Sequence, residues 1–190
     1  MMSRLKSPNI NMAELEKIIQ MPHLTKEVKI IQLRDRAILE ILYSTGLKVS
    51  ELSTLTNQQI DFENGLIIIE NKNRIKKVIL TNQAVYYLKQ YMTAKNDEST
   101  ILFIRYDRAK TNMTPSEVKP LTPRSIQRLV EKYGKKSGIL EKITPGSFRQ
   151  NFAIRLFAME NKLELIQTAM GYGCKNTTKI YQNKIYQRVD

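Results

Sequence analysis

The sequence predicts an α+β fold, a mainly helical single domain with one small three-stranded antiparallel sheet. Apolar residues recur at the helical period over most of the chain, and only residues 60–80 change to short apolar runs between turn residues. The apolar content of 42% over 190 residues is enough for a buried core. No apolar run approaches the ~20 residues that cross a bilayer, which disfavours a membrane protein.

The N-terminal part of the chain is predicted to be helical. Asn11 is a suitable N-cap for a short helix that stops at Pro22. A longer helix follows over about residues 26–44, and Gly46 is its stop signal. Ser50 is then positioned to cap another short helix.

Three short strands are predicted between residues 60 and 80. The apolar runs at 60–62, 66–69 and 78–80 are separated by the turn Asn64-Gly65 and by a polar stretch at 71–73. This order of strands and turns is typical of an antiparallel meander.

Helical periodicity returns at Thr81 and governs most of the remaining chain. A brief buried strand or turn is expected at 102–103, followed by a loop at 105–121 and a helix that Thr122 caps. Two more helices follow, with the apolar stripes Phe148, Phe152, Leu156 and Met159 in the first and Leu163, Ile166 and Met170 in the second. Gly171 and Gly173 are expected to end the second helix.

The charge balance points to a polyanionic partner. The chain carries 31 Lys and Arg residues against 18 Asp and Glu residues, which gives a formal net charge of +13 and a pI of about 9.8. Such an excess is typical of nucleic-acid binding, and the alternatives are a generally basic surface or contact with an anionic membrane. No basic amphipathic helix with a broad aromatic face supports the membrane alternative.

Several common catalytic sites lack members in this sequence. His23 is the only histidine and is expected at the surface, so a Ser-His-Asp triad, a His-rich metal site and a Cys-His pair are excluded. Cys174 is the only cysteine, which excludes an internal disulfide and a multi-cysteine zinc site and favours a reducing cytoplasm. No glycine-rich phosphate loop follows a strand, and neither a cofactor nor a metal is expected. Lys, Arg and Tyr remain to carry chemistry.

Ordered motifs along the chain resemble those of the tyrosine recombinases. Residues 42–52, Leu-Tyr-Ser-Thr-Gly-Leu-Lys-Val-Ser-Glu-Leu, are similar to the T-G-L-R-V-S-E-L motif of the Xer type, with lysine in place of arginine. The predicted strands at 66–80 lie where that family carries a β-hairpin lysine. Residues 144–149 resemble the H-x-x-R motif, residues 170–172 the L-G-H/W motif and residues 177–181 the nucleophile segment. The resemblance covers the chain from about residue 11 to residue 181.

The resemblance implies an enzyme of DNA recombination and integration that cuts and rejoins DNA through a 3′-phosphotyrosyl intermediate. Tyr181 takes the place of the nucleophile, and Arg149 that of a phosphate-clamping arginine. Lys48 stands where another arginine is expected, and Tyr172 where a later His or Trp is expected. Gly146 replaces the motif histidine, so imidazole is not available as a general base.

These residue types agree with the needs of a phosphodiester displacement. Negative charge develops on the nonbridging oxygens, which requires fixed cations around them, a nucleophile in line and a proton donor opposite. The resemblance implies that a hairpin lysine is this donor. Lys72 is the best candidate, although an ungapped alignment places Asn71 there and Arg74 lies within reach. The structural alternative is that these are ordinary packing or surface residues.

The helix that begins with the Thr-Pro pair is the predicted DNA-reading element. Arg124 and Arg128 lie about one turn apart with Gln127 beside them, a spacing that suits major-groove bases or flanking phosphates. Lys119 and Lys135 extend the positive charge on both sides. The alternative is a solvated helix face.

The predicted organisation is one tyrosine recombinase catalytic domain over residues 1–190, without the N-terminal core-binding domain that family members usually carry. The expected partner is double-stranded DNA, with other recombinase subunits as homo- or hetero-oligomers on it. Two alternatives are open. One is a DNA-binding module of the same fold that has lost catalysis, and the other is an RNA-binding protein served by the same positive charge.

Overall fold

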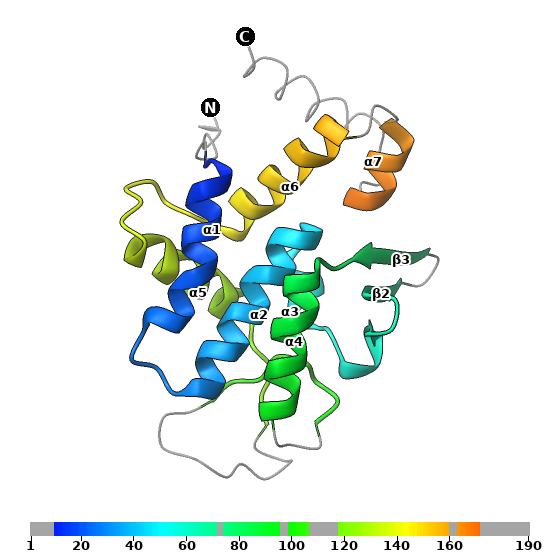
Figure 1. The fold of residues 1–190 in the computed structure, drawn as a ribbon. Coiled ribbons are helices and arrows are strands. Elements are labelled where there is room, and N and C mark those ends of the chain that lie inside the picture. Colours follow the sequence, from blue (N-terminus) through cyan, green and yellow to red (C-terminus); the bar gives the residue numbers. More distant parts are fainter. Residues whose placement is uncertain (1–9, 72–73, 96–98, 107–117, 160–162, 172–190) are drawn as a thin grey trace, which may run out of the picture.

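The computed structural model describes residues 10–71, 74–95, 99–106, 118–159 and 163–171. In chain order its elements are α1 (Met12–Gln20), the 3₁₀ turn η1 (Met21–Leu24), α2 (Lys29–Thr45), α3 (Val49–Ser53), the 3₁₀ turn η2 (Asn57–Gln59), β1 (Ile60–Asp61), β2 (Leu66–Asn71), β3 (Arg74–Ile79), α4 (Asn82–Ala94), α5 (Pro123–Lys136), α6 (Pro145–Met159) and α7 (Leu163–Met170). Helices form most of the molecule, and the small sheet lies at one side (Figure 1). The predicted α+β class is confirmed.

The sheet is the predicted antiparallel meander, in the order β1-β2-β3. Leu66 pairs with Ile79 and Asn71 with Arg74, so β2 and β3 are aligned over their whole length. Both strands are longer than their apolar runs predict. The added residues include Lys76 of β3, which lies in the candidate site described below.

Helix α2 is the central element of the fold. It packs against α1, α4 and α6, and its residues from Leu33 onward are almost all buried. The helix ends at Gly46, whose φ of 57° is the left-handed conformation that glycine adopts readily, so the predicted stop is confirmed. None of the helices in the described ranges has the length and apolar character needed to span a membrane.

Buried charges on α2 are paired with groups from other elements. The guanidinium of Arg34 donates to Asp35 Oδ1 at 2.7 Å and to the carbonyl of Ile104 at 3.1 Å. The hydroxyl of Tyr133, on α5, donates to Asp35 Oδ2 at 2.8 Å. These bonds fix α2 against α5 and the 104–106 segment, because a buried carboxylate is stable only when its oxygens have donors.

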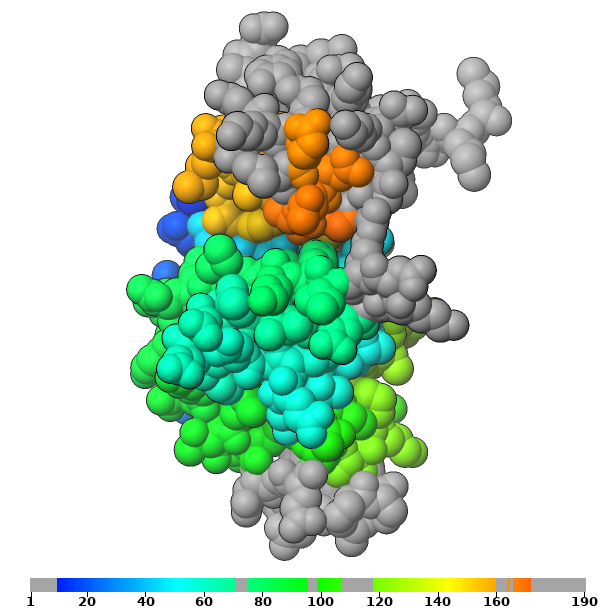
Figure 2. Space-filling model, turned by 90° about the vertical axis from the view of Figure 1, so that its right-hand side faces the viewer, coloured from blue at the N-terminus to red at the C-terminus, as the bar shows by residue number. Residues whose placement is uncertain are grey.

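Helices α6 and α7 form a second, smaller apolar cluster at the end of α2. Its buried members are Ala153, Phe157, Ile166 and Met170. Met159 was expected in the buried stripe of α6, but it is 86% exposed, and Phe157 takes the inward position. In Figure 2 these two helices lie above the sheet, at the side of the molecule where β3 and α7 make contact.

Two local predictions are corrected by the structure. His23 was expected at the surface, but it is half-buried against the ring of Tyr87, and burial, helped by Arg36 and Lys29, lowers its pKa. Ser50 was expected to cap the helix that follows Gly46, but it lies inside α3. A local sequence pattern shows neither the neighbours of His23 nor the start of α3.

Tyr133→Phe tests the buried network, because it removes one hydroxyl and keeps the ring. Asp35 then loses the donor to Oδ2 inside the core, and the free energy of unfolding should fall by about 1–3 kcal/mol in urea denaturation. Tyr86→Phe on α4, at an exposed tyrosine, is the matched control and should change it by less than about 0.5 kcal/mol. Equal losses in the two variants would contradict the role of the network.

Candidate active site

The turn between α2 and α3 gives the site its shape. Thr45 Oγ1 donates to the carbonyl of Ile41 at 2.6 Å and accepts the N–H of Leu47 at 3.2 Å. Leu47 is buried, which anchors the turn to the core. The next residue, Lys48, is exposed at the N-cap of α3. The sequence Thr-Gly-Leu-Lys therefore places one lysine at a fixed point on the surface.

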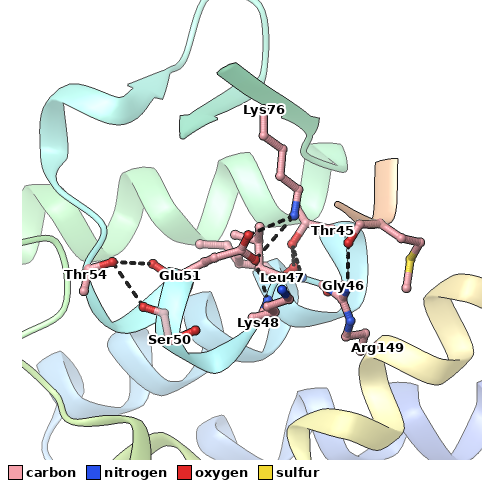
Figure 3. A network of polar contacts seen from close by, with 11 residues as sticks. Thr45, Gly46, Leu47, Lys48, Ser50, Glu51, Thr54, Lys76 and Arg149 are labelled. Carbon is pink, nitrogen blue, oxygen red and sulfur yellow. Dashed lines mark hydrogen bonds and ion pairs between the residues drawn. The ribbon is translucent and has the colours of Figure 1, made fainter. Parts of the chain in front are cut away.

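Glu51 organises the start of α3. Its Oε2 accepts the backbone N–H of Lys48 at 2.7 Å, which satisfies a donor that the helix leaves open. The same carboxylate lies 3.3 Å, by both oxygens, from Nζ of Lys76 on β3 (Figure 3). One side chain thus joins the helix start to the sheet.

Arg149 is held by two backbone carbonyls. It follows Phe148, which is completely buried, in α6. Its NH1 donates to the carbonyl of Gly46 at 2.5 Å and its NH2 to the carbonyl of Met170 at 2.6 Å. Both carbonyls stand at helix C-termini, where the partial negative charge of the helix stabilises a cation. The guanidinium is therefore fixed where the ends of α2 and α7 meet (Figure 3).

Lys76 completes a group of basic side chains that we call the cationic cluster: Lys48, Lys76 and Arg149. Only 10% of the Lys76 side chain is exposed. Burial lowers the pKa of its ammonium, the Glu51 carboxylate raises it, and Arg149 and Lys48 lower it further, so the net direction is down. A group of fixed cations suits the oxygens of a phosphodiester.

The structure brings together some of the predicted catalytic residues. Lys48 and Arg149 both lie in the cationic cluster, and their catalytic roles stay predictions; the sequence analysis did not include Lys76. The predicted residues Lys72, Tyr172 and Tyr181 lie outside the described residues, and their roles stay predictions. Alternation along β3 was the signal that could have found Lys76, because it places Lys76 on the same face as a buried valine.

Gly146, which stands in place of the motif histidine, is exposed in the first turn of α6. Its φ is not positive, and a Cβ there would meet only Thr144 Oγ1, at 3.2 Å. The backbone at this position therefore accepts a side chain with a small shift of one hydroxyl.

The predicted DNA-reading residues lie on the outer side of α5. Arg124, Gln127 and Arg128 are exposed, while the opposite face of the helix is buried in the core. Lys119 and Lys135 are also exposed, and Lys135 pairs with Glu131 at 3.2 Å. Helix α5 packs against α3 and α6, the elements next to Lys48 and Arg149.

Comparison with known proteins agrees with this architecture. The model of the phage integrase family matches residues 9–188. The chain belongs to the phage integrase family. Among solved structures, the XerA recombinase has a TM-score of 0.75 at 22% identity, over 97% of this chain and 64% of that one. The XerH recombinase in a post-cleavage complex with its palindromic difH substrate has a TM-score of 0.76 at 23% identity, over 95% and 50%. The fold is that of a tyrosine recombinase catalytic domain.

Curated relatives of this phage integrase family member are tyrosine recombinases. The chain is 34% identical over 170 residues to the tyrosine recombinase XerC of Thermodesulfovibrio yellowstonii, covering 87% of this chain and 54% of the relative. It is 30% identical over 183 residues to XerA of Pyrococcus furiosus, covering 94% and 60%. The chain thus spans little more than half the length of these relatives.

Gly46→Ala and Gly138→Ala separate backbone strain from close packing in the site. Both glycines have positive φ, at 57° and 79°. A Cβ at Gly46 would lie 2.5 Å from Cδ1 of Phe152, whereas a Cβ at Gly138 meets nothing within 4 Å. Gly138→Ala should lower the free energy of unfolding by about 1 kcal/mol, and Gly46→Ala by about 1–3 kcal/mol more. Equal losses in chemical denaturation would show that the Phe152 contact is not limiting.

Proposed function

We propose that this chain is the catalytic domain of a site-specific tyrosine recombinase, which cuts and rejoins duplex DNA through a 3′-phosphotyrosyl intermediate. The observation that carries the proposal is the cationic cluster at the meeting point of α2, α3, β3, α6 and α7. Arg149 and Lys48 clamp the scissile phosphate, a lysine of the β2–β3 hairpin protonates the leaving 5′ oxygen, and Tyr181 is the nucleophile. Tyr172, next to the end of α7, takes the place of the family's later His or Trp.

The geometry supports catalysis more than simple DNA binding. A surface that only binds DNA needs exposed charges, which water and salt screen. The cluster instead includes Lys76, which is mostly buried, and Arg149. The guanidinium of Arg149 is held in place by carbonyls at two helix ends. Fixed donors of this kind stabilise developing charge without rearranging during the reaction. The curated relatives carry the name tyrosine recombinase, which supports the same conclusion.

Double-stranded DNA is the proposed substrate and partner. The solved XerH neighbour is bound to its difH DNA substrate, and the net charge of +13 gives this chain the electrostatics for a similar partner. Other recombinase subunits are the proposed protein partners on DNA. A DNA substrate also makes the cytoplasm the proposed compartment.

Tyr181→Phe tests the nucleophile. The wild-type chain is incubated with a pool of nicked duplexes of randomised sequence, and covalent protein–DNA adducts are separated on a denaturing gel and sequenced. We expect an adduct with the wild type and none with Tyr181→Phe, because only the attacking phenolic oxygen is lost. DNA affinity, measured by gel shift, should stay nearly unchanged.

Two outcomes of this experiment would contradict the proposal. An adduct that persists in Tyr181→Phe would move the nucleophile elsewhere, with Tyr186 the next candidate. A wild-type chain that shifts DNA reversibly but forms no adduct would leave only a DNA-binding module.

The salt dependence of binding tests the contribution of α5. The logarithm of the association constant should fall linearly with the logarithm of the salt concentration, with a slope of about 0.9 per phosphate neutralised. Arg124→Ala should reduce that slope by about 1 if its guanidinium meets a phosphate. Lys89→Ala on α4 removes one exposed charge elsewhere and is the control, with the wild-type slope expected. An equal reduction in both variants would refute a specific role for α5.

A further inference from the structure

Arg155 lies on α6, after Arg149, and contacts the last turn of α2. Its guanidinium carbon is 4.0 Å from the centre of the Tyr43 ring, and its NH2 donates to the backbone carbonyl of Tyr43. Both side chains are half-buried, so the stacked pair is partly shielded from water. A planar guanidinium that stacks on a ring and also donates a hydrogen bond is held in one orientation.

The Tyr43 carbonyl is open to Arg155 because of the way in which α2 ends. In a continuing helix this carbonyl would accept the N–H of Leu47, four residues further on. Gly46 takes a left-handed conformation instead, and the Leu47 N–H donates to Thr45 Oγ1 at 3.2 Å (Figure 3). Arg155 supplies the donor that the end of the helix lacks. It therefore caps α2 from a different helix.

Three side chains of α6, each three residues from the next, hold the end of α2. Arg149 donates to the carbonyl of Gly46, and the Phe152 ring lies so close to Gly46 that a Cβ there would be 2.5 Å from it. Arg155 adds a contact about one turn earlier in α2. We call Arg149, Phe152 and Arg155 the α6 clasp. The clasp holds α2 directly before the turn that carries Lys48.

Stability alone is a poor explanation for an arginine at this position. The Nε of Arg155 is buried and has no hydrogen-bond partner among the described residues. A buried donor without an acceptor costs free energy, and an apolar side chain of similar length would avoid that cost. The contacts with Tyr43 offset the cost, so we expect little net stabilisation. The arginine instead fixes the position of α6 along α2.

We propose that Arg155 is a positioning residue for DNA cleavage, which holds the end of α2 against α6 so that Lys48 and Arg149 meet the same phosphate. Lys48 follows α2 and Arg149 stands on α6, so the distance between them depends on this contact. A misplacement of about 1 Å in a catalytic group can slow a reaction by ~10²-fold. Arg155 acts through Lys48 and does not itself contact the phosphate. The inference rests on the proposed function and adds a residue to it.

Arg155→Met tests this role, because methionine keeps an apolar stem and removes the charge and the donors. The substrate is the DNA recovered in the adduct experiment. We expect adduct formation at saturating DNA to slow by about tenfold or more. The dissociation constant in gel shifts should change by less than about threefold, because the exposed charges that bind DNA remain. The melting temperature should fall by no more than about 4 °C.

Tyr133→Phe is the control for a loss of stability. It weakens the buried Asp35 network and leaves the α6 clasp intact. Below its melting temperature it should form the adduct at the wild-type rate. An unchanged rate in Arg155→Met would overturn the proposal. An equal fall in rate in Tyr133→Phe would also overturn it, because destabilisation alone would then explain the effect.

A double-mutant cycle with Lys48→Met separates positioning from a general loss of structure. If Arg155 acts by placing Lys48, its substitution matters little once Lys48 is absent. We expect Arg155→Met to slow the reaction about tenfold or more when Lys48 is present, and less than about twofold in the Lys48→Met background. Equal factors in the two backgrounds would show that Arg155 acts independently of Lys48 and would overturn the proposal.

Tyr43→Leu is a second variant, which keeps the backbone carbonyl and removes the ring on which Arg155 stacks. It should slow adduct formation with the same dependence on Lys48. A wild-type rate in Tyr43→Leu would overturn the proposal even if Arg155→Met fails to fold. A wild-type chain that forms no adduct overturns the proposed function and this inference together. If the inference alone is wrong, the wild type forms the adduct and the clasp variants form it equally fast.

Discussion

The two hydrogen bonds from Arg149 to the carbonyls of Gly46 and Met170 are the interaction on which the site depends. They join the central helix α2, which lies in the main core with Phe148 of α6, to α7, which packs with the later part of α6 around a much smaller apolar cluster. So small a cluster gives limited hydrophobic stabilisation, and charge-assisted bonds to two helix ends add to it. The residue proposed to clamp phosphate therefore also holds the end of α7.

Charge is handled in two different ways in this molecule. Inside the core, the Asp35 carboxylate forms an ion pair with Arg34 and accepts a hydrogen bond from Tyr133. In the site, the Glu51 carboxylate pairs with Lys76, while the positive charges of Lys48 and Arg149 also act on that lysine. The core network is closed and serves stability, whereas an excess of positive charge held in place is stabilised further by an anion from outside. This contrast marks the cationic cluster as the candidate functional site without reference to any motif.

Sequence patterns predicted most of the fold, because its local rules are strong. The apolar period located the long helices, Gly46 ended α2, and Asn64-Gly65 placed the first turn of the sheet. Lys76 was missed because two adjacent lysines in a strand are normally expected to be exposed to solvent. Only the packing of the sheet against α3 shows that one of them is buried. Its partner Glu51 lies 25 residues away along the chain, and no local pattern carries that information. Met159 and His23 were misplaced for the same reason, since tertiary packing decided their burial.

Two of the departures from the recombinase pattern, Lys48 and Gly146, remove different chemical groups. Lys48 keeps the charge of the expected arginine but loses its two-pronged geometry, and its backbone N–H is already committed to Glu51. Gly146 removes an imidazole from an exposed position that water reaches. A proton leaving the nucleophile can pass to water there, whereas an alkoxide leaving group at neutral pH requires a donor within contact. The half of the proton chemistry that solvent can perform is therefore the half that this chain leaves without a histidine.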